Sequence, residues 1–223
     1  MELDDDLRGF IQTTFTCPPE VAERIGARAS DRRFPARAHI LRQGDDSDET
    51  LLVVDGRAHA LLYGADGQVL LLREFGRGDL FGAVASLDGG GHEADVVAVE
   101  DVRAALFLAL DFIALIESHP SVGLAVSRQL LKQLRATARR MVEHATLSAA
   151  GRVQAELLRM ARLEGDGTTI RPAPVLSALA VRVHTTRETV SRTISALERR
   201  GLVRRDDDAL VLTAPQRLEA MIV

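Results

Sequence analysis

Arginine, glutamate and hydroxyl side chains gather at the start of one predicted helix, in the stretch TTRETVSRTISALERRGLV that begins at Thr185. Helical spacing places Arg187, Glu188, Ser191 and Arg192 toward one face at the N-terminal end of this helix. Arginine forks onto the O6 and N7 atoms of guanine, and glutamate accepts a hydrogen bond from N4 of cytosine. The polar face therefore predicts a reader of G·C base pairs in the major groove of DNA.

A structural interpretation of the same residues stays open. Thr185 and Glu188 have the spacing of a capping box, in which Glu188 would only complete the helix start. Glu188 and Arg192 also have the i,i+4 spacing of an ion pair on one helix. On this interpretation the side chains at the helix start stabilise the helix and contact no base.

The segments around this helix favour DNA binding. Val190, Ile194 and Leu197 recur at i, i+4 and i+7, which predicts the buried face of the helix. A short helix in VLSALAVRVH precedes it, and GLVRRDDDALVLT follows as two short strands around its three aspartates. A short helix, a tight turn and a second helix form the helix-turn-helix pattern, to which the hairpin adds a wing.

The distribution of charge agrees with two functional parts. The whole chain of 223 residues has a net charge of −4. Residues 147–223 hold 12 arginines and no lysine against 9 acidic residues, a balance of +3. The rest of the chain holds 16 basic against 23 acidic residues, a balance of −7. A basic C-terminal part on an acidic body supports binding of nucleic acid by that part.

A long helix is predicted from Ser121 to Ala145, where no proline interrupts the pattern. Its apolar residues recur three or four apart and form one stripe: Val122, Val126, Leu130, Leu134, Ala138, Met141 and Ala145. The stripe could face the body of its own chain or form a coiled-coil-like dimer seam. We prefer the seam, because about 25 residues at ~1.5 Å each would overhang a small barrel. A second helix follows from Leu147 to Leu163 and ends at Gly165.

Short apolar runs between residues 33 and 108 predict an antiparallel sandwich or barrel. Turn residues separate these runs, for example at 44–46, 64–67 and 76–79. Residues 4–28 have helical spacing that Pro18 and Pro19 interrupt. The chain is therefore predicted to be an α+β protein.

The stretch LAVRVHTTRETVSRTISALERRGLV resembles the C-terminal region of the Crp/Fnr family of bacterial transcription regulators. The segment TLLVVDGRAHALLYGADGQVLLLREFGRGDLFG is similar to the β-roll of that family, and the order of elements agrees over nearly the whole chain. The resemblance implies a helical segment at 1–28, a cyclic-nucleotide-binding-like sensor roll at 29–110, a dimerisation region at 111–146 and a winged helix-turn-helix domain at 147–223.

The resemblance also implies how DNA is read. Positions that match Arg187, Glu188 and Arg192 read the bases of TGTGA-type half-sites in the family, Ser191 matches a base-reading position of the Fnr branch, and Thr186 joins the DNA-contacting set. A homodimer would then bind a pseudo-palindrome whose half-site centres lie roughly 34 Å apart. The loop at 165–174 matches one that contacts RNA polymerase in relatives.

The effector site departs from the family pattern. Relatives that bind cAMP carry a glutamate for the ribose and an arginine for the phosphate in the cassette that here reads FGAVASLDGGGHEADVVAV. Gly82 matches the pattern, whereas Ala83 stands at the glutamate position, and Glu93 and Ala94 stand at the arginine and hydroxyl positions. Thr137 matches a purine-contacting position. Because Glu93 would repel a phosphate, cAMP binding is disfavoured, and the roll is expected to hold another effector or none.

Other cofactors have little support in the sequence. Cys17 is the only cysteine, so an iron–sulfur cluster, which needs about four thiolates, is not expected. His39, His59, His92 and Cys17 are conceivable haem ligands without supporting spacing, and the His92-Glu93 pair on a glycine-rich loop does not predict a metal site.

The expected function is a cytoplasmic, homodimeric transcription regulator that binds double-stranded DNA. The start MELDDDLRGF has no apolar signal core, and no run of about twenty uncharged apolar residues predicts a membrane span. We find no nucleophile–base pair, phosphate loop or zinc spacing, so enzymatic activity is not expected. The alternative is a ligand-sensing interaction protein that uses its helix-turn-helix for protein contacts.

Overall fold

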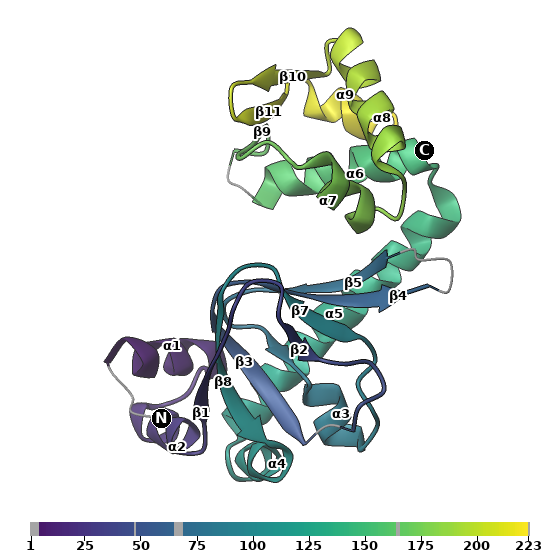
Figure 1. The fold of residues 1–223 in the computed structure, drawn as a ribbon. Coiled ribbons are helices and arrows are strands. Elements are labelled where there is room, and N and C mark those ends of the chain that lie inside the picture. The colour runs from purple at the N-terminus through teal and green to yellow at the C-terminus, as the bar shows by residue number, and fades with distance from the viewer. Residues whose placement is uncertain (1–4, 47, 65–68, 164–165, 223) are drawn as a thin grey trace. The chain divides into compact units, whose positions relative to one another are not determined.

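The computed structural model describes residues 5–46, 48–64, 69–163 and 166–222 (Figure 1). The chain divides into two compact units, Met1–Arg135 and Ala136–Val223. Both units combine helices with antiparallel sheets, which confirms the predicted α+β class. In the described part, no single helix has the length and hydropathy to cross a membrane, and the only adjoining pair that passes that test together is bent by 113°.

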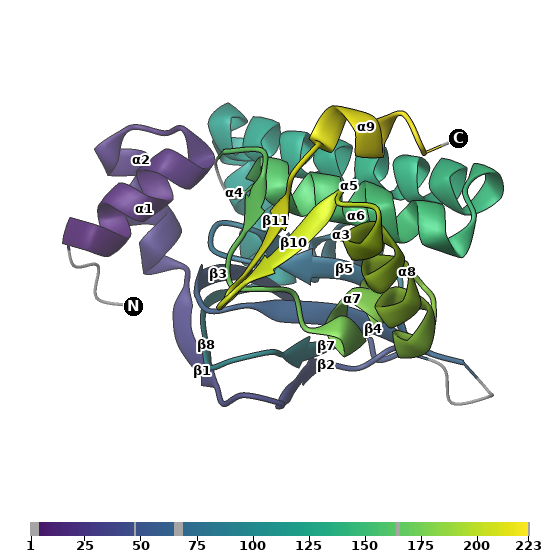
Figure 2. The same cartoon turned by 90° about the horizontal axis from the view of Figure 1, so that it is seen from above.

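The first unit is built around two four-stranded antiparallel sheets. Its helices are α1 (Asp5–Phe15), α2 (Pro19–Ala27), α3 (Ala83–Asp88), α4 (Ala109–Ser118) and the first part of α5 (Pro120–Thr146). Its strands are β1 (Ser30–Phe34), β2 (His39–Leu41), β3 (Glu49–Asp55), β4 (Ala58–Tyr63), β5 (Val69–Phe75), β6 (Leu80–Phe81), β7 (Asp95–Ala98) and β8 (Val102–Leu108). The strand orders are β1-β8-β3-β6 and β2-β7-β4-β5. Figure 2 shows α1 and α2 side by side near the N-terminus.

Strand β3 is buried on both faces, which explains why its sequence does not alternate. Leu51 and Val53 pack into the core between the two sheets, together with residues of β4, β5 and β7. Leu52 and Val54 point the other way, into a second core shared with α1, α2, α4 and α5. A strand covered on both faces reads as a continuous apolar run, here TLLVV, rather than as an in–out pattern.

An irregularity between β4 and β5 decides which side chains of β5 face inward. Ala60 pairs with Arg73, but the next residue, Leu61, pairs with Leu71, so Leu72 is an extra residue in β5. Such a bulge bends the strand and re-aims its side chains. Arg73 stands opposite Ala60, whose side chain lies in the core between the sheets, and so it shares the inward face of β5.

The second unit packs its helices around a small sheet. It contains the last part of α5, α6 (Ala149–Leu163), α7 (Leu176–Arg182), α8 (Arg187–Arg199), α9 (Pro215–Glu219), and the strands β9 (Thr169–Ile170), β10 (Val203–Asp206) and β11 (Ala209–Leu212). The strands pair in the order β10-β11-β9. Leu157 of α6, Leu179 of α7 and Ile194 of α8 meet in one core with Ile170 and Leu210 of the sheet.

Most predicted elements are present with shifted ends. The long helix begins at Pro120 rather than Ser121 and ends at Thr146, and the next helix begins at Ala149 rather than Leu147. The paired prolines separate α1 from α2, as predicted. Strand β9 and the helices α4 and α9 were not predicted. The predicted turn at 65–67 and the helix end at Gly165 lie outside the described residues.

Candidate DNA-binding surface and ligand cavity

Helices α7 and α8 form the predicted helix-turn-helix, with a turn at residues 183–186. The turn is tied to α7 by backbone hydrogen bonds from Val183 to Leu179 (3.0 Å) and from Thr185 to Ala180 (2.9 Å). His184 has a φ of 50°. This left-handed backbone costs a non-glycine residue of order 1–3 kcal/mol, so the surrounding contacts must hold it in place. The turn is thus a constrained connection that fixes where α8 starts.

Helix α8 buries the stripe that its periodicity predicts. Val190, Ile194 and Leu197 are at most 1% exposed and pack into the core of the second unit. Thr193 is also buried and donates its hydroxyl to the carbonyl of Thr189 (2.8 Å). With one face held in this way, the opposite face at the helix start is left to solvent.

The sequence-predicted DNA-contacting residues gather at that exposed start. Thr186, Arg187, Glu188 and Arg192 are exposed, and Ser191 is half-buried. An N-terminal turn with exposed polar side chains is the part of a recognition helix that enters the major groove. The structure brings all five predicted residues together on one surface.

The helix cap lies one residue later than the sequence interpretation placed it. Thr186, not Thr185, is the N-cap, and its Oγ1 accepts a hydrogen bond from the backbone N–H of Thr189 (3.1 Å). Glu188 therefore does not occupy the capping-box position, which is three residues after the cap. Its carboxylate instead lies 3.2 Å from Arg192, as the ion-pair alternative expected.

Buried charges connect α6 to its neighbours in the second unit. Glu156 of α6 is 5% exposed and forms ion pairs with Arg159 and with Arg182 of α7 (3.3 Å). Arg159 also pairs with Glu143 at the end of α5 (2.7 Å). Burial lowers the pKa of Arg159, and the adjacent Glu143 carboxylate opposes that shift. A buried carboxylate with two partners fixes its helices, because loss of one partner would leave a buried charge uncompensated.

The predicted wing is present as the hairpin β10–β11, whose residues pair from Val203↔Leu212 to Asp206↔Ala209. Arg205 forms an ion pair with Glu198 of α8 (2.9 Å), which ties the hairpin to that helix. Strand β9 adds a third strand through Thr169 and Ile170. Its signal in the sequence was two threonines and an isoleucine, a β-forming run too short to separate from the loop.

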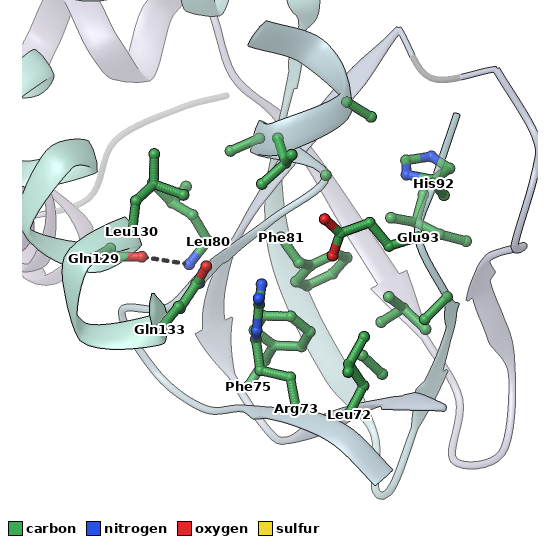
Figure 3. A pocket seen from close by; sticks show the side chains of 18 of the residues that line it. Leu72, Arg73, Phe75, Leu80, Phe81, His92, Glu93, Gln129, Leu130 and Gln133 are labelled. Atoms are coloured by element: carbon green, nitrogen blue, oxygen red, sulfur yellow. Dashed lines mark hydrogen bonds between the residues drawn. The ribbon is translucent and has the colours of Figure 1, made fainter. Parts of the chain in front are cut away.

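A cavity in the first unit lies between the roll, α3 and the first part of α5 (Figure 3). Its walls are mostly apolar, with Phe75 and Phe81 on one side and Leu130 of α5 on the other. Gln129 of α5 joins the helix to the roll. Its side chain accepts a hydrogen bond from the N–H of Leu80 (2.9 Å) and donates one to the carbonyl of Gly78 (2.6 Å). The cavity lining is therefore bonded directly to α5.

Four of the five residues predicted for an effector line this cavity. They are Gly82, Ala83, Glu93 and Ala94. Thr137, the fifth, is an exposed residue of α5 and is not among the lining residues that the structure describes. Gly82 has a φ of 79°, and a Cβ there would lie 2.3 Å from the carbonyl oxygen of Glu49, so only glycine fits.

One charged residue of the cavity is absent from the set that the sequence predicts. Arg73 of β5 lines the cavity across from Glu93 (Figure 3). The bulge in β5 and the pairing with Ala60 supply the inward orientation, and neither is visible in the sequence. The cavity thus offers one cationic and one anionic side chain among apolar walls.

The histidines and the cysteine that were candidate ligands lie in separate surroundings, and only His92 lines the cavity. His92 is buried, and burial lowers its pKa. His39 lies near Asp95 (3.7 Å) and His59 near Glu74 (3.3 Å). Burial raises the pKa of the Cys17 thiol. Among the described residues, no group of three or more histidine, cysteine or acidic side chains is arranged to hold a metal ion.

The apolar stripe of α5 has two parts. Val122 and Val126 are buried in the core of the first unit, as the own-body interpretation expected. Leu134 and Met141 are 65% and 75% exposed, and the neighbouring Val142 is 60% exposed. The second part therefore presents large apolar side chains to solvent in the single chain, which is unusual for a helix without a partner.

Comparison with known proteins identifies both parts of the chain. The model of the cyclic nucleotide-binding domain matches residues 31–119, and that of the Crp-like helix-turn-helix domain matches residues 151–221. The "Cyclic AMP receptor protein" of Thermus thermophilus is 33% identical over 186 residues, which cover 83% of this chain and 85% of the relative. The chain belongs to the Crp/Fnr family.

Further relatives agree with this assignment. The "CRP-like cAMP-activated global transcriptional regulator" of Mycobacterium tuberculosis is 26% identical over 192 residues, which cover 83% of this chain and 84% of the relative. The structure of FixK2 from Bradyrhizobium japonicum covers 87% of this chain and 98% of its own, with a TM-score of 0.74 at 21% identity, and so agrees in fold. As a Crp/Fnr protein, this chain is a DNA-binding transcription regulator, and α8 is the second helix of its helix-turn-helix.

Proposed function

We propose that this Crp/Fnr protein binds a pseudo-palindromic, TGTGA-like DNA site as a homodimer. The observation that carries the proposal is the exposed start of α8, where Arg187, Glu188 and Arg192 face solvent while the opposite stripe is buried. Arginine and glutamate at this position discriminate G·C pairs, at about 1–3 kcal/mol for each good contact.

The exposed part of the α5 stripe supports the homodimer. Leu134 and Met141 are the residues that a second copy of α5 would cover, in a coiled-coil-like seam. Two recognition helices would then enter successive major grooves, with half-site centres about 34–36 Å apart. We place the protein in the cytoplasm and propose that the loop around 166–174 contacts RNA polymerase.

We further propose that the effector of the roll, if the cell supplies one, is not cAMP. The Thermus relative is named a cyclic AMP receptor protein, but Ala83 and Glu93 replace the ribose and phosphate contacts in this cavity. A carboxylate beside a phosphate repels it, and Ala83 has no group for a hydroxyl. The cation of Arg73 lies in the same cavity but comes from β5, whereas Ala83 begins α3 and Glu93 lies just before β7.

The site proposal is tested by selection from random double-stranded oligonucleotides with the purified full-length protein. We expect enrichment of an inverted repeat with guanine-containing half-sites. Failure to enrich any sequence, or a strictly monomeric protein, would refute it. Addition of saturating cAMP should leave the affinity for the selected site unchanged, and a large increase would refute the effector proposal.

The alternative role is a sensing protein whose helix-turn-helix binds another protein. The salt dependence of DNA affinity distinguishes this role from DNA binding. DNA affinity falls steeply with salt concentration because bound counterions are released from phosphates. A selected oligonucleotide bound without this dependence would favour the alternative. We propose no enzymatic activity, and turnover of a substrate by the pure protein would overturn that part.

A further inference from the structure

Arg152 of α6 donates hydrogen bonds to three backbone carbonyls, two of which are more than 30 residues away in the sequence. Its Nε donates to the carbonyl of Val183 (3.0 Å), its Nη2 to that of His184 (3.1 Å) and its Nη1 to that of Leu147 (3.1 Å). The first two carbonyls belong to the turn before α8, and the third to the link between α5 and α6. One partly buried guanidinium thus joins three segments of the second unit.

The carbonyls of Val183 and His184 follow α7 and need a hydrogen-bond donor from outside that helix. The last carbonyls of α7 have no partner within the helix, and a cation near a helix C-terminus is favourable. The φ of 50° at His184 turns the chain sharply toward Thr186, the cap of α8. Arg152 therefore holds the turn at its left-handed residue, His184, which lies two residues before the N-cap of α8.

The side chain of His184 is half-buried and contacts the end of α5. Its ring lies 4.7 Å from the ring of His144 at the end of α5, centroid to centroid. Its Nδ1 is buried and has no hydrogen-bond partner among the described residues. The ring contact adds apolar packing to the hydrogen bonds of Arg152, so the turn is fixed through both its backbone and its side chain.

We propose that Arg152 is a positioning residue for DNA binding, because its three hydrogen bonds hold the turn at 183–186 and thereby set the start of α8. This proposal rests on the proposed base reading by α8. A lysine cannot replace Arg152, since its single ammonium lacks the planar fork that reaches three carbonyls at once.

The test compares Arg152→Lys and Arg152→Met in the full-length protein with Arg162→Met as the matched control. Arg162 lies on the same helix in an exposed ion pair with Glu219 (2.8 Å). Amide hydrogen exchange is measured at His184, Thr185 and Thr189, whose N–H groups are hydrogen-bonded. Affinity for the selected DNA site is measured over a series of salt concentrations. In both Arg152 variants we expect exchange to rise on the order of tenfold or more at these amides.

Specific DNA affinity should fall about tenfold in the Arg152 variants, with the slope of log affinity against log salt unchanged. An unchanged slope distinguishes positioning from a phosphate contact, whose loss would lower the slope by about 1. The control should alter neither exchange nor affinity. Unchanged exchange in both variants, or a lowered slope, would overturn the proposal.

Two further outcomes are separable. If Arg152→Met does not fold, Arg152→Lys decides, because it retains the charge and most of the side-chain length. If the wild-type protein selects no DNA site, base reading by α8 fails. The exchange comparison then still shows whether Arg152 holds the turn, and exchange that stays slow in Arg152→Lys would refute that role.

Discussion

The carboxylate of Glu188 lies 3.2 Å from the guanidinium of Arg192, one turn further along α8, and the two side chains are 75% and 71% exposed. Two of the proposed base readers are therefore paired with one another in the DNA-free protein. An exposed i,i+4 pair contributes only about 0.3–0.5 kcal/mol, which is small against about 1–3 kcal/mol for a good base contact. DNA can thus separate the pair at little energetic cost.

Arg187→Ala should remove discrimination at one guanine of each half-site while the melting temperature stays unchanged. Arg187 is exposed and contributes nothing to the buried face of α8, so its loss affects DNA contact alone. The expected loss is about 1–3 kcal/mol against the cognate base. This loss is measured by competition binding with oligonucleotides in which each position of the half-site carries each of the other bases in turn. Arg199→Ala, at the exposed end of the same helix, should keep the base preference, and an unaltered preference in Arg187→Ala would refute its docking.

Glu188→Gln should change base preference with little effect on stability, because Glu188 is not the helix cap. Thr186→Ala is the matched comparison: it removes the cap and should destabilise the protein by about 0.5–2 kcal/mol. Chemical denaturation of both variants, alongside oligonucleotide selection, separates the two roles. A large loss of stability in Glu188→Gln with unchanged selection would restore the structural interpretation.

The second unit should lose stability as the pH falls below about 6.5. Burial, followed by the nearby His144, Arg140 and Arg152, lowers the pKa of His184 to about 4. Unfolded histidine has a pKa of about 6.5, so between these values the unfolded chain binds more protons than the folded one. The stabilisation is complete above pH 6.5 and is lost progressively toward pH 4.

Urea denaturation between pH 7.5 and 5 measures this effect. Burial lowers the pKa of His144 as well, so both rings act in the same direction. His184→Asn tolerates the left-handed backbone and removes the titrating ring, and it should show a flatter dependence on pH. Equal slopes in the variant and the wild type would contradict the assignment to His184.

Leu134→Asp should convert the proposed homodimer to monomers. A carboxylate at this position cannot be buried in an apolar seam without a partner. Arg139→Asp places the same group on α5 outside the apolar stripe and should leave the dimer intact. Sedimentation equilibrium measures the association. Affinity for the full inverted repeat should fall only in the variant that loses the dimer. A dimer that survives Leu134→Asp would show that the interface lies elsewhere.

The fold class and the exposed face of α8 could be predicted because they depend on local periodicity. Val190, Ile194 and Leu197 repeat on one face of α8, so the exposed face followed directly from the sequence. Strand β3 was found as an apolar run, but its burial on both faces comes from the packing of α4 and α5, which no local pattern encodes.

The cavity was predicted less completely, for a topological reason. Glu93 and Gly82 lie in one cassette of the sequence, whereas Arg73 reaches the same cavity from β5 through the register of a bulge. The cap of α8 was misplaced by one residue because Thr185 and Thr186 are adjacent and chemically equal. Only the backbone geometry of the turn, with its left-handed His184, distinguishes them.

The crowding around Gly82 limits how the sensor can diversify. Any side chain there would collide with the carbonyl of Glu49, so natural variation or a directed-evolution library can gain nothing at that position. Positions 73, 83 and 93 line the same space without this constraint. A biosensor built on this scaffold would therefore acquire new inducers by randomising those three codons while position 82 is held invariant.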